Sequence, residues 1–426
     1  MNLNKQNEMT RKAFMEFVSR TALGVSLTPN ALFGLNREAL NQASGTAKSV
    51  IYLNMKGGMS QMDTFDVKDH FSHIGYVGAK DGERVCAHLP KTAAIMDRVT
   101  SINSMTTNTA GHAPAQYILH HSYSSQAGAS HPSLGAWILK EQGRINQSLP
   151  GYITIGGNVY GTAGFLGGKY AALPVGHPDQ GIQNTKRHRA VTERDFQKRV
   201  EMFRLMNKSF LADSPSLIAK SYDELYVETA NLMNSKDLEA FNLSNESPKT
   251  ISRYAGDNID LTFAKGCVLA RRLVEKGVKY VEVTLDGWDT HIDNDNKVQN
   301  LCQILDSAYS SLILDLESRG LLDSTLVVLA TEFGRKPLMS DQGGRGHHPG
   351  AFTTLLAGGG VKAGIRYGKT DETASKVLQD KVTPGDLNAT IAHCCGVDVD
   401  QKHFDPSGRL FKVAGKKSEP IWGVLS

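Results

Sequence analysis

The chain has 426 residues, a formal net charge of +4 and 7% aromatic residues. This length is enough for one large α/β domain or two ordinary domains, whereas the nearly balanced charge and few aromatic residues argue against the basic, aromatic-lined groove of a nucleic-acid-binding protein. No uninterrupted apolar stretch approaches the roughly 18–20 residues that span a bilayer, so the sequence predicts no transmembrane segment.

The first part of the chain has the pattern of a targeting signal. Residues 10–15 (Thr-Arg-Lys-Ala-Phe-Met) resemble a twin-arginine export signal whose second arginine is replaced by lysine. A modestly apolar stretch at residues 21–35 and small residues around Ala43 and Ala47 follow, as in a signal peptide and its cleavage site. We therefore predict an export leader over residues 1–47 and a periplasmic or otherwise exported protein. The alternative is an amphipathic N-terminal helix that stays attached to a cytoplasmic protein.

Strand and helix patterns begin after the leader. Residues 48–55 form an apolar run that predicts a buried first strand, which ends at the glycine-containing turn of residues 56–60. A helical pattern at residues 91–97 leads into a short apolar run at residues 99–102. The segment 105–121 then begins polar and becomes helical.

The middle of the chain differs in composition. Glycine and proline punctuate residues 151–181, which is typical of irregular loops. Residues 191–240 are charged and place apolar residues at helical spacing. We predict a loop-rich and helical insertion over residues 151–255 of a single domain that spans residues 48–426. The helical part suits a lid and a partner-docking surface equally well.

Alternating helix and strand patterns resume after the insertion, and this rhythm predicts a largely parallel sheet. The predicted elements are a helix at residues 261–276, a strand at 278–285, a helix at 296–318, a strand at 324–330, an apolar run at 351–357 and a final helix at 384–394.

Acidic and histidine residues gather just beyond these predicted strands. In open α/β sheets, ligands bind beyond the carboxyl ends of the strands, so we expect these side chains to converge. Carboxylates and imidazoles are the ligands that divalent metals take at hydrolytic sites. The predicted metal ligands are Asp286, Asp289, His291, Glu332, His347 and His348.

Each of these residues also has a structural interpretation. The aspartates suit a turn and His291 suits a helix cap, and Glu332 with Arg335 suits an ion pair at a strand end. In the functional interpretation Arg335 neutralises an anionic substrate. Adjacent side chains point apart, so we expect one of His347 and His348 to bind metal directly.

The turn after the first strand carries further candidates. Gly57 and Gly58 allow close approach of a ligand to the backbone, and with Ser60 they form a predicted anion-binding turn. Asp63 is a further predicted metal ligand. An N-capped helix or turn start is the alternative for Ser60 and Asp63.

A polar stretch precedes the predicted helix within residues 105–121. A helix N-terminus attracts phosphate or sulfate, so Asn108 and His112 are predicted to bind an anion, with His112 among the catalytic residues. Thr109 is the predicted metal-activated nucleophile. A helix cap is the alternative role for Thr109.

These residues, in this order, resemble the exported bacterial family catalogued as domain of unknown function 1501, which is related to the sulfatase and alkaline-phosphatase superfamily. The resemblance implies a three-layer α/β/α sandwich around a mostly parallel sheet, with a metal-dependent site for phosphate or sulfate esters. It is carried by blocks at residues 50–66, 112–115, 132–137, 269–275, 287–291, 332–335, 347–349 and 356–361.

Three departures from the superfamily pattern imply an altered or reduced metal centre. The first strand of superfamily hydrolases commonly ends in a metal-binding aspartate, where this chain has Gly57. An aspartate-histidine pair after a later strand is replaced by Glu332 and Phe333. No Cys-x-Pro-x-Arg sequence occurs, so the formylglycine nucleophile of typical sulfatases is absent.

The leading hypothesis is an exported hydrolase of phosphate or sulfate esters that uses a divalent metal: zinc, calcium, magnesium or manganese. Its substrate would be a small-molecule or glycan ester. The alternative is a catalytically degenerate member of the superfamily that binds an anionic glycan or a protein partner in the periplasm. Convergence of the candidate ligands within metal-binding reach would favour the hydrolase.

Overall fold

The structure is a computed structural model that describes residues 45–426, except residues 70–73, 158–159, 184, 186–187, 214–222, 225, 227–228, 231 and 234. Residues 1–44 of the predicted export leader therefore lie outside the described residues. The last residue of the predicted leader, Ala47, is buried, and its N–H donates to Cys394 O at 2.9 Å.

Across the described residues the main sheet has eight strands, and β1 (Ser49–Met55) is one of its inner strands. The strand β11 pairs antiparallel with both neighbours, whereas the other pairs in this sheet are parallel. A hairpin of β9 (Gly334–Met339) and β10 (Arg345–His348) joins β8 to β11 in place of a crossover helix, so the chain returns antiparallel. The spatial order is β12 (Arg366–Tyr367), β4 (Val99–Met105), β11 (Phe352–Gly358), β8 (Thr325–Ala330), β1, β7 (Tyr280–Leu285), β5 (Tyr152–Ile155) and β6 (Leu173–Val175).

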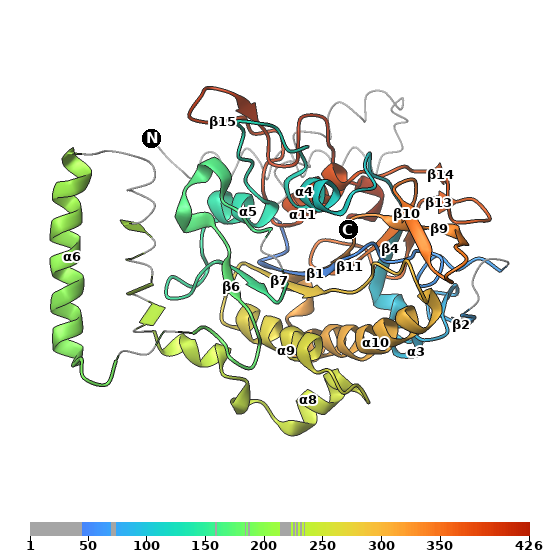
Figure 1. Cartoon of the computed structure of the whole chain (residues 1–426), viewed down its shortest axis with the longest axis horizontal. Helices are drawn as coiled ribbons and strands as arrows, with labels where there is room; N and C mark the ends of the chain where they lie inside the picture. The colour runs from blue at the N-terminus through green and yellow to red at the C-terminus, as the bar shows by residue number, and fades with distance from the viewer. Residues whose placement is uncertain are drawn as a thin grey trace, which may run out of the picture. The chain divides into compact units, whose positions relative to one another are not determined.

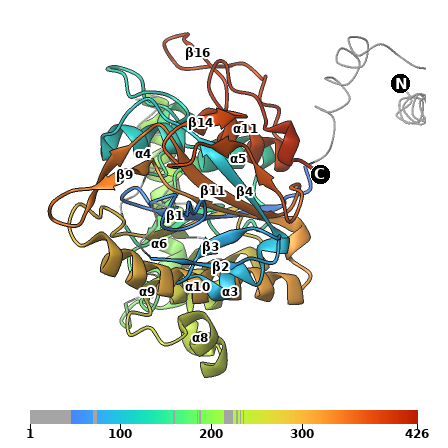
Figure 2. The same cartoon turned by 90° about the vertical axis from the view of Figure 1, so that its right-hand side faces the viewer.

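The strand β1 is apolar on both faces, so both faces of the sheet must be covered, and helices cover them. Ile51, Leu53 and Met55 belong to one hydrophobic cluster, and Val50 and Tyr52 belong to another. A strand buried on both sides reads as a nearly continuous apolar run. Figures 1 and 2 show α3 (Pro90–Ala93), α9 (Thr262–Glu275) and α10 (Asn294–Ser318) on one side of the sheet and α4 (His112–His121), α5 (Leu134–Gln142) and α11 (Pro384–Cys394) on the other. The predicted three-layer α/β/α sandwich is confirmed.

The segment predicted as an insertion, residues 151–255, begins with part of the sheet. The strand β5 pairs with β7 and with β6, so the irregular loops predicted at residues 151–181 hold the last two strands on one side of the sheet, with β6 at its edge. The helical part contains α6 (Glu193–Asp213), η4 (Lys236–Phe241), η5 (Leu243–Asn245) and α8 (Pro248–Ala255).

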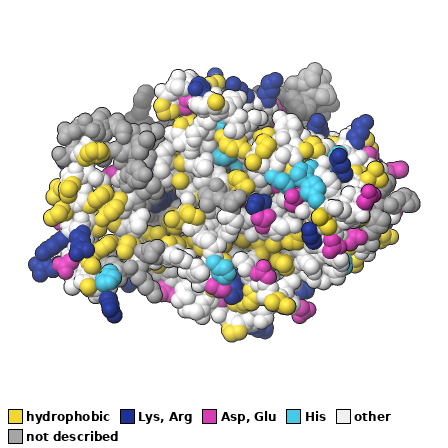
Figure 3. Space-filling model, in the orientation of Figure 1, with side chains coloured by type: hydrophobic (Ala, Val, Ile, Leu, Met, Phe, Trp, Pro, Cys, Tyr) yellow, Lys and Arg dark blue, Asp and Glu magenta, His cyan; other side chains and the backbone are white. Residues whose placement is uncertain are grey.

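The helix α6 exposes an apolar row, and Figure 3 shows hydrophobic side chains on this part of the surface. Its members Met202, Leu205, Met206 and Phe210 are 57–68% exposed. Within the described residues, no helix combines the length and apolar character that a membrane crossing requires.

Short elements complete the described structure. Three further hairpins pair β2 with β3, β13 with β14 and β15 with β16. The bounds are β2 (Tyr76–Gly78), β3 (Arg84–Cys86), β13 (Lys369–Thr370), β14 (Val377–Gln379), β15 (His403–Phe404), β16 (Leu410–Phe411), η1 (Met96–Arg98), η2 (Gly164–Leu166), η3 (Gly168–Tyr170), η6 (Leu322–Ser324) and η7 (Trp422–Val424).

Candidate metal centre

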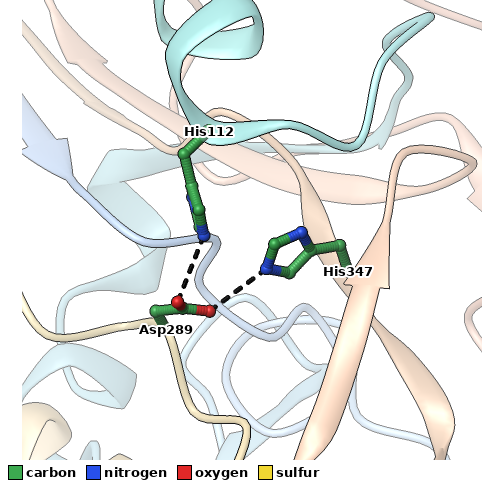
Figure 4. Close-up of side chains that lie close together, drawn as sticks. All are labelled: His112, Asp289 and His347. Carbon is green, nitrogen blue, oxygen red and sulfur yellow. Dashed lines mark hydrogen bonds and ion pairs between the residues drawn. The ribbon is translucent and has the colours of Figure 1, made fainter.

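Three adjacent parallel strands, β1, β7 and β8, end at the same edge of the sheet. Asp289 lies in the loop after β7, His112 is the first residue of α4, and His347 lies in β10. Figure 4 shows these three side chains pointing toward one another, and their ligand atoms all lie within 4.8 Å of one another. The structure therefore brings three of the predicted site residues together from three separate segments of the chain.

The distances in this cluster suit a bound cation. His112 Nε2 lies 3.3 Å from Asp289 Oδ2, and His347 Nε2 lies 3.2 Å from Asp289 Oδ1. Bonds of about 2.0–2.2 Å at tetrahedral angles place the nitrogen and oxygen ligands of zinc about 3.4 Å apart. His291 adds a third imidazole, whose Nε2 lies 2.8 Å from His347 Nε2 and 3.1 Å from Asp289 Oδ1. His112, Asp289 and His347 thus form a candidate site for one divalent ion, and His291 lies beside it.

This cluster is open to solvent on one side. The side chains of Asp289 and His291 are 46% and 50% exposed. Figure 3 shows histidine side chains gathered on the surface where Figure 1 places α4 and β10. A substrate would therefore have access to the cluster from the face drawn in Figure 1.

Hydrogen bonds behind two of the rings fix which nitrogen faces Asp289. His112 Nδ1 lies 2.8 Å from Glu332 Oε1, and His347 Nδ1 lies 2.6 Å from Ala110 O. These oxygens accept, so Nδ1 of each ring carries the proton and Nε2 of the neutral ring presents a lone pair to Asp289. His112 Nε2 is buried and makes no hydrogen bond with any residue that the structure describes. A lone pair that faces a carboxylate requires a cation between them, either a proton or a metal ion.

Asp289 is ionised at neutral pH. Burial acts to raise its pKa, but the hydrogen bond from Arg335 Nη2 (2.6 Å) and the charge of Arg335 lower the pKa to about 2. The hydrogen bond to Glu332 raises the pKa of His112, whereas burial lowers the pKa of His291. The cluster therefore combines a fixed negative charge with imidazoles that bind a proton or a metal ion.

Glu332, a predicted metal ligand, lies behind His112. Its side chain is fully buried, and Oε1 accepts from His112 Nδ1 and from Gly57 N at 3.0 Å. Oε2 accepts from Gln116 Nε2 at 2.9 Å. In this position Glu332 orients His112, as carboxylates commonly do for metal-binding histidines. Gln116 was not among the predicted site residues, although its i+4 spacing from His112 places both on one face of α4.

Arg335, the predicted anion clamp, is fully buried beneath the cluster. Its Nε donates to Gly58 O at 2.8 Å, and its Nη1 donates to Arg345 O at 2.8 Å. Its Nη2 donates to Gly57 O as well as to Asp289. The guanidinium therefore holds the loop after β1 and orients Asp289, and its side chain is closed to solvent.

Asp63, a further predicted ligand, lies in a buried ion pair. Arg345 donates to Asp63 Oδ2 from Nε at 2.8 Å and to Oδ1 from Nη2 at 3.1 Å. Ser60 Oγ and Asn294 Nδ2 donate to the same carboxylate at 2.7 and 3.1 Å. These four donors explain why an aspartate is tolerated there without solvent. The structure does not bring Asp63 or Ser60 into the cluster.

Two other predicted ligands have partners outside the cluster. Asp286 is exposed and forms an ion pair with Lys56, with Nζ 2.5 Å from Oδ2. His348 Nε2 lies 2.6 Å from Ser375 O, so its ring faces away from His347. Of the two adjacent histidines, the structure thus places His347 in the cluster.

Gly57 and Gly58 have positive φ angles of 117° and 83°. A Cβ atom on Gly57 would lie 2.5 Å from Asp289 N, and one on Gly58 would lie 2.6 Å from the Phe333 ring. These glycines are therefore required by close packing of the loop against the cluster. The N–H of Gly57 donates to Glu332, so it is occupied by a protein group.

The stretch before α4 forms a turn. Thr109 Oγ1 accepts from Gly111 N at 3.3 Å, and Thr109 is half-buried. Asn108 is exposed on the same turn. Both residues lie directly before the helix that carries His112. Their roles as nucleophile and anion contact stay predictions.

The fold and the site define an α/β sandwich protein with a candidate metal centre beyond the carboxyl ends of its inner strands. Residues 47–425 match the model of the family described as "Protein of unknown function (DUF1501)", and the chain belongs to this family. The family resemblance seen in the sequence is thereby confirmed. A comparison with curated proteins gave no match.

Solved structures similar to this chain include sulfatases and a zinc-containing domain. The PsFucS1 sulfatase from Pseudoalteromonas sp. is 14% identical over 85% of this chain and 70% of that chain, with a TM-score of 0.38. A Bacteroides thetaiotaomicron protein (BT33336S-sulf), from a locus for the metabolism of multiple glycosaminoglycans, is 10% identical over 89% of this chain and 81% of that chain, with a TM-score of 0.42. The C-terminal periplasmic domain of EcEptC from Escherichia coli, in complex with Zn, is 10% identical over 87% and 94%, with a TM-score of 0.38.

Proposed function

We propose that this protein hydrolyses phosphate or sulfate esters with one divalent metal ion held by His112, Asp289 and His347, with His291 beside it. The observation that carries the proposal is the arrangement of the Nε2 lone pairs of His112 and His347 around the Asp289 carboxylate, at 3.3 and 3.2 Å. Of zinc, calcium, magnesium and manganese, this set of two imidazoles and one carboxylate favours zinc, because calcium and magnesium prefer oxygen ligands, and it leaves a coordination position for water.

In this proposal the metal ion and the residues around it have separate roles in hydrolysis. A bound ion would supply Lewis acidity and lower the pKa of a water molecule toward about 7. Glu332 holds the proton on His112 Nδ1, and Arg335 keeps Asp289 ionised and in place. Either this water, as hydroxide, or Thr109 would attack the ester, and Asn108 is the candidate contact for the anion. The export leader predicted over residues 1–47 would bring this site to small-molecule or glycan esters in the periplasm.

The test is the metal content of full-length protein purified without chelator, measured by mass spectrometry, together with calorimetric titration of zinc. We expect about one equivalent per chain, and its loss in His112→Ala and His347→Ala. His348→Ala is the matched control, since that ring faces Ser375 and its loss should leave zinc in place. Hydrolysis of p-nitrophenyl sulfate and bis(p-nitrophenyl) phosphate by the zinc-loaded protein then tests the reaction. Wild-type protein without stoichiometric metal would refute the proposal.

One observation favours a second candidate function, binding of an anionic glycan or a protein partner without turnover. Arg335, the predicted cation for the transferred group, is fully buried with its N–H groups engaged by backbone carbonyls and Asp289. Metal-loaded protein that binds a sulfated glycan but cleaves no ester would support this second function.

A further inference from the structure

An ion pair lies beside the candidate metal centre at the same edge of the sheet. Met55 and Leu285 are partners in the parallel register of β1 and β7, so the next residues, Lys56 and Asp286, also lie side by side. Lys56 Nζ is 2.5 Å from Asp286 Oδ2, and the side chains are 23% and 58% exposed. The pair is therefore within reach of solvent and of a solvent-borne ligand.

The backbone connects this pair directly to the centre. Gly57, the residue after Lys56, donates its N–H to Glu332 at 3.0 Å. Asp286 begins the short loop that carries Asp289. The hydrogen bond to Asp286 raises the pKa of Lys56, and the charge of Glu332 acts in the same direction, so Lys56 is a cation at neutral pH.

The charges around the centre nearly cancel one another. Arg335 offsets Asp289 through a contact of 2.6 Å, and Lys56 offsets Asp286. The buried carboxylate of Glu332 leaves one negative charge, so a divalent ion would leave the centre with one positive charge. A substrate with one negative charge would balance it. A second negative charge on the substrate would need a further cation. Lys56 cannot fully serve as this cation, because it is paired with Asp286.

We propose that the Lys56–Asp286 ion pair makes this site select esters that carry one negative charge, such as sulfate monoesters and phosphate diesters, over phosphate monoesters, which carry two at pH 8. The inference rests on the proposed function. Asp286 is then a specificity-determining residue, because it holds the ammonium group that would otherwise meet the second charge of a phosphate monoester.

The experiment uses Asp286→Asn in the full-length, zinc-loaded protein. This change keeps the shape of the side chain and releases Lys56. We expect the affinity for inorganic phosphate, measured by calorimetry at pH 8 and low salt, to rise about fivefold, which is the upper range for an exposed charge pair. The ratio of kcat/KM for p-nitrophenyl phosphate to that for bis(p-nitrophenyl) phosphate should rise in parallel.

Two controls separate this effect from net charge. Asp257→Asn removes an exposed carboxylate beyond α8 and should leave phosphate affinity unchanged. The double variant Lys56→Met, Asp286→Asn removes both charges and should return phosphate affinity to the wild-type value. A gain confined to Asp286→Asn supports the inference.

The outcomes distinguish the inference from the proposed function. Unchanged phosphate affinity in zinc-loaded Asp286→Asn, or a wild-type preference for phosphate monoesters, overturns the inference and leaves the metal site standing. Wild-type protein that binds no zinc overturns the proposed function, and the inference is lost with it.

Discussion

Replacement of Glu332 by glutamine should weaken metal binding although the side chain is no ligand in the proposed site. Glu332 accepts a hydrogen bond from His112 Nδ1 at 2.8 Å and is fully buried. A glutamine has one oxygen for the donors of His112, Gly57 and Gln116, so its NH₂ group must face one of them. Facing His112, it would move the proton to Nε2 and remove the lone pair that faces Asp289; facing Gln116, it would still remove the charge that orients His112. Loss of such an orienting group lowers metal affinity about 10–100-fold, or about 1.4–2.7 kcal/mol.

The assay for Glu332→Gln is calorimetric titration of zinc, with nitrogen-15 NMR of the imidazoles to report the tautomer of His112. Glu282→Gln is the matched control. Glu282 is also a buried carboxylate that contacts a histidine, with Oε1 3.1 Å from His120 Nε2, and it lies within β7 outside the cluster. Zinc affinity of Glu332→Gln within threefold of wild type, or an equal loss in Glu282→Gln, would refute the reasoning.

Further predictions concern stability and are checked by urea unfolding. Arg335→Met leaves buried backbone carbonyls and Asp289 without their donor and should lower the free energy of unfolding by about 3–5 kcal/mol. The control Arg253→Met removes a 48% exposed cation and should lower it by at most about 1 kcal/mol. Gly57→Ala should cost about 2–4 kcal/mol, because a close contact adds to backbone strain; Gly82→Ala, at a φ of 89° with open space around it, should show the strain alone, about 1–2 kcal/mol. Burial and the charge of His120 lower the pKa of His121 to about 3. The unfolded chain then takes up a proton at His121 that the folded chain does not bind, so His121 alone should lower the free energy of unfolding by about 2 kcal/mol from pH 7 to pH 5, and His121→Gln should reduce the measured loss by this amount.

Long buried elements of the fold were predictable from the sequence. The strand expected at residues 278–285 is Tyr280–Leu285, and the helix expected at residues 296–318 is Asn294–Ser318. Both carry apolar residues at the period of their secondary structure. The strands β5 and β6 escaped prediction because they have four and three residues and lie among glycines. The antiparallel direction of β11 also escaped, since direction depends on the path of the preceding hairpin.

The sequence predicted the residues of the candidate site only where residue type and position relative to a strand determine whether a side chain joins the site. Asp289 and His291 follow the end of β7 and meet His347 of the β9–β10 hairpin in the structure. The roles expected for Asp63 and Arg335 depended on partners that no local pattern reveals. Asp63 meets Arg345 across 282 positions of the sequence, and the donors of Arg335 meet carbonyls of the turn after β1. The spatial order of the strands brings those partners close, and this order could not be predicted from the sequence.

The close packing at Gly57 bears on how many metal ions the centre can hold. The resemblance to superfamily hydrolases places a metal-binding aspartate at this position, and glycine replaces it here. A Cβ atom at Gly57 would meet the backbone of Asp289 at 2.5 Å, and the guanidinium of Arg335 donates to the carbonyl of Gly57. The backbone of Asp289 thus fills the space beside Gly57, and Arg335 occupies the carbonyl oxygen of Gly57. A positive side chain beside Asp289 also disfavours a second cation, so this arrangement favours a single metal ion per chain.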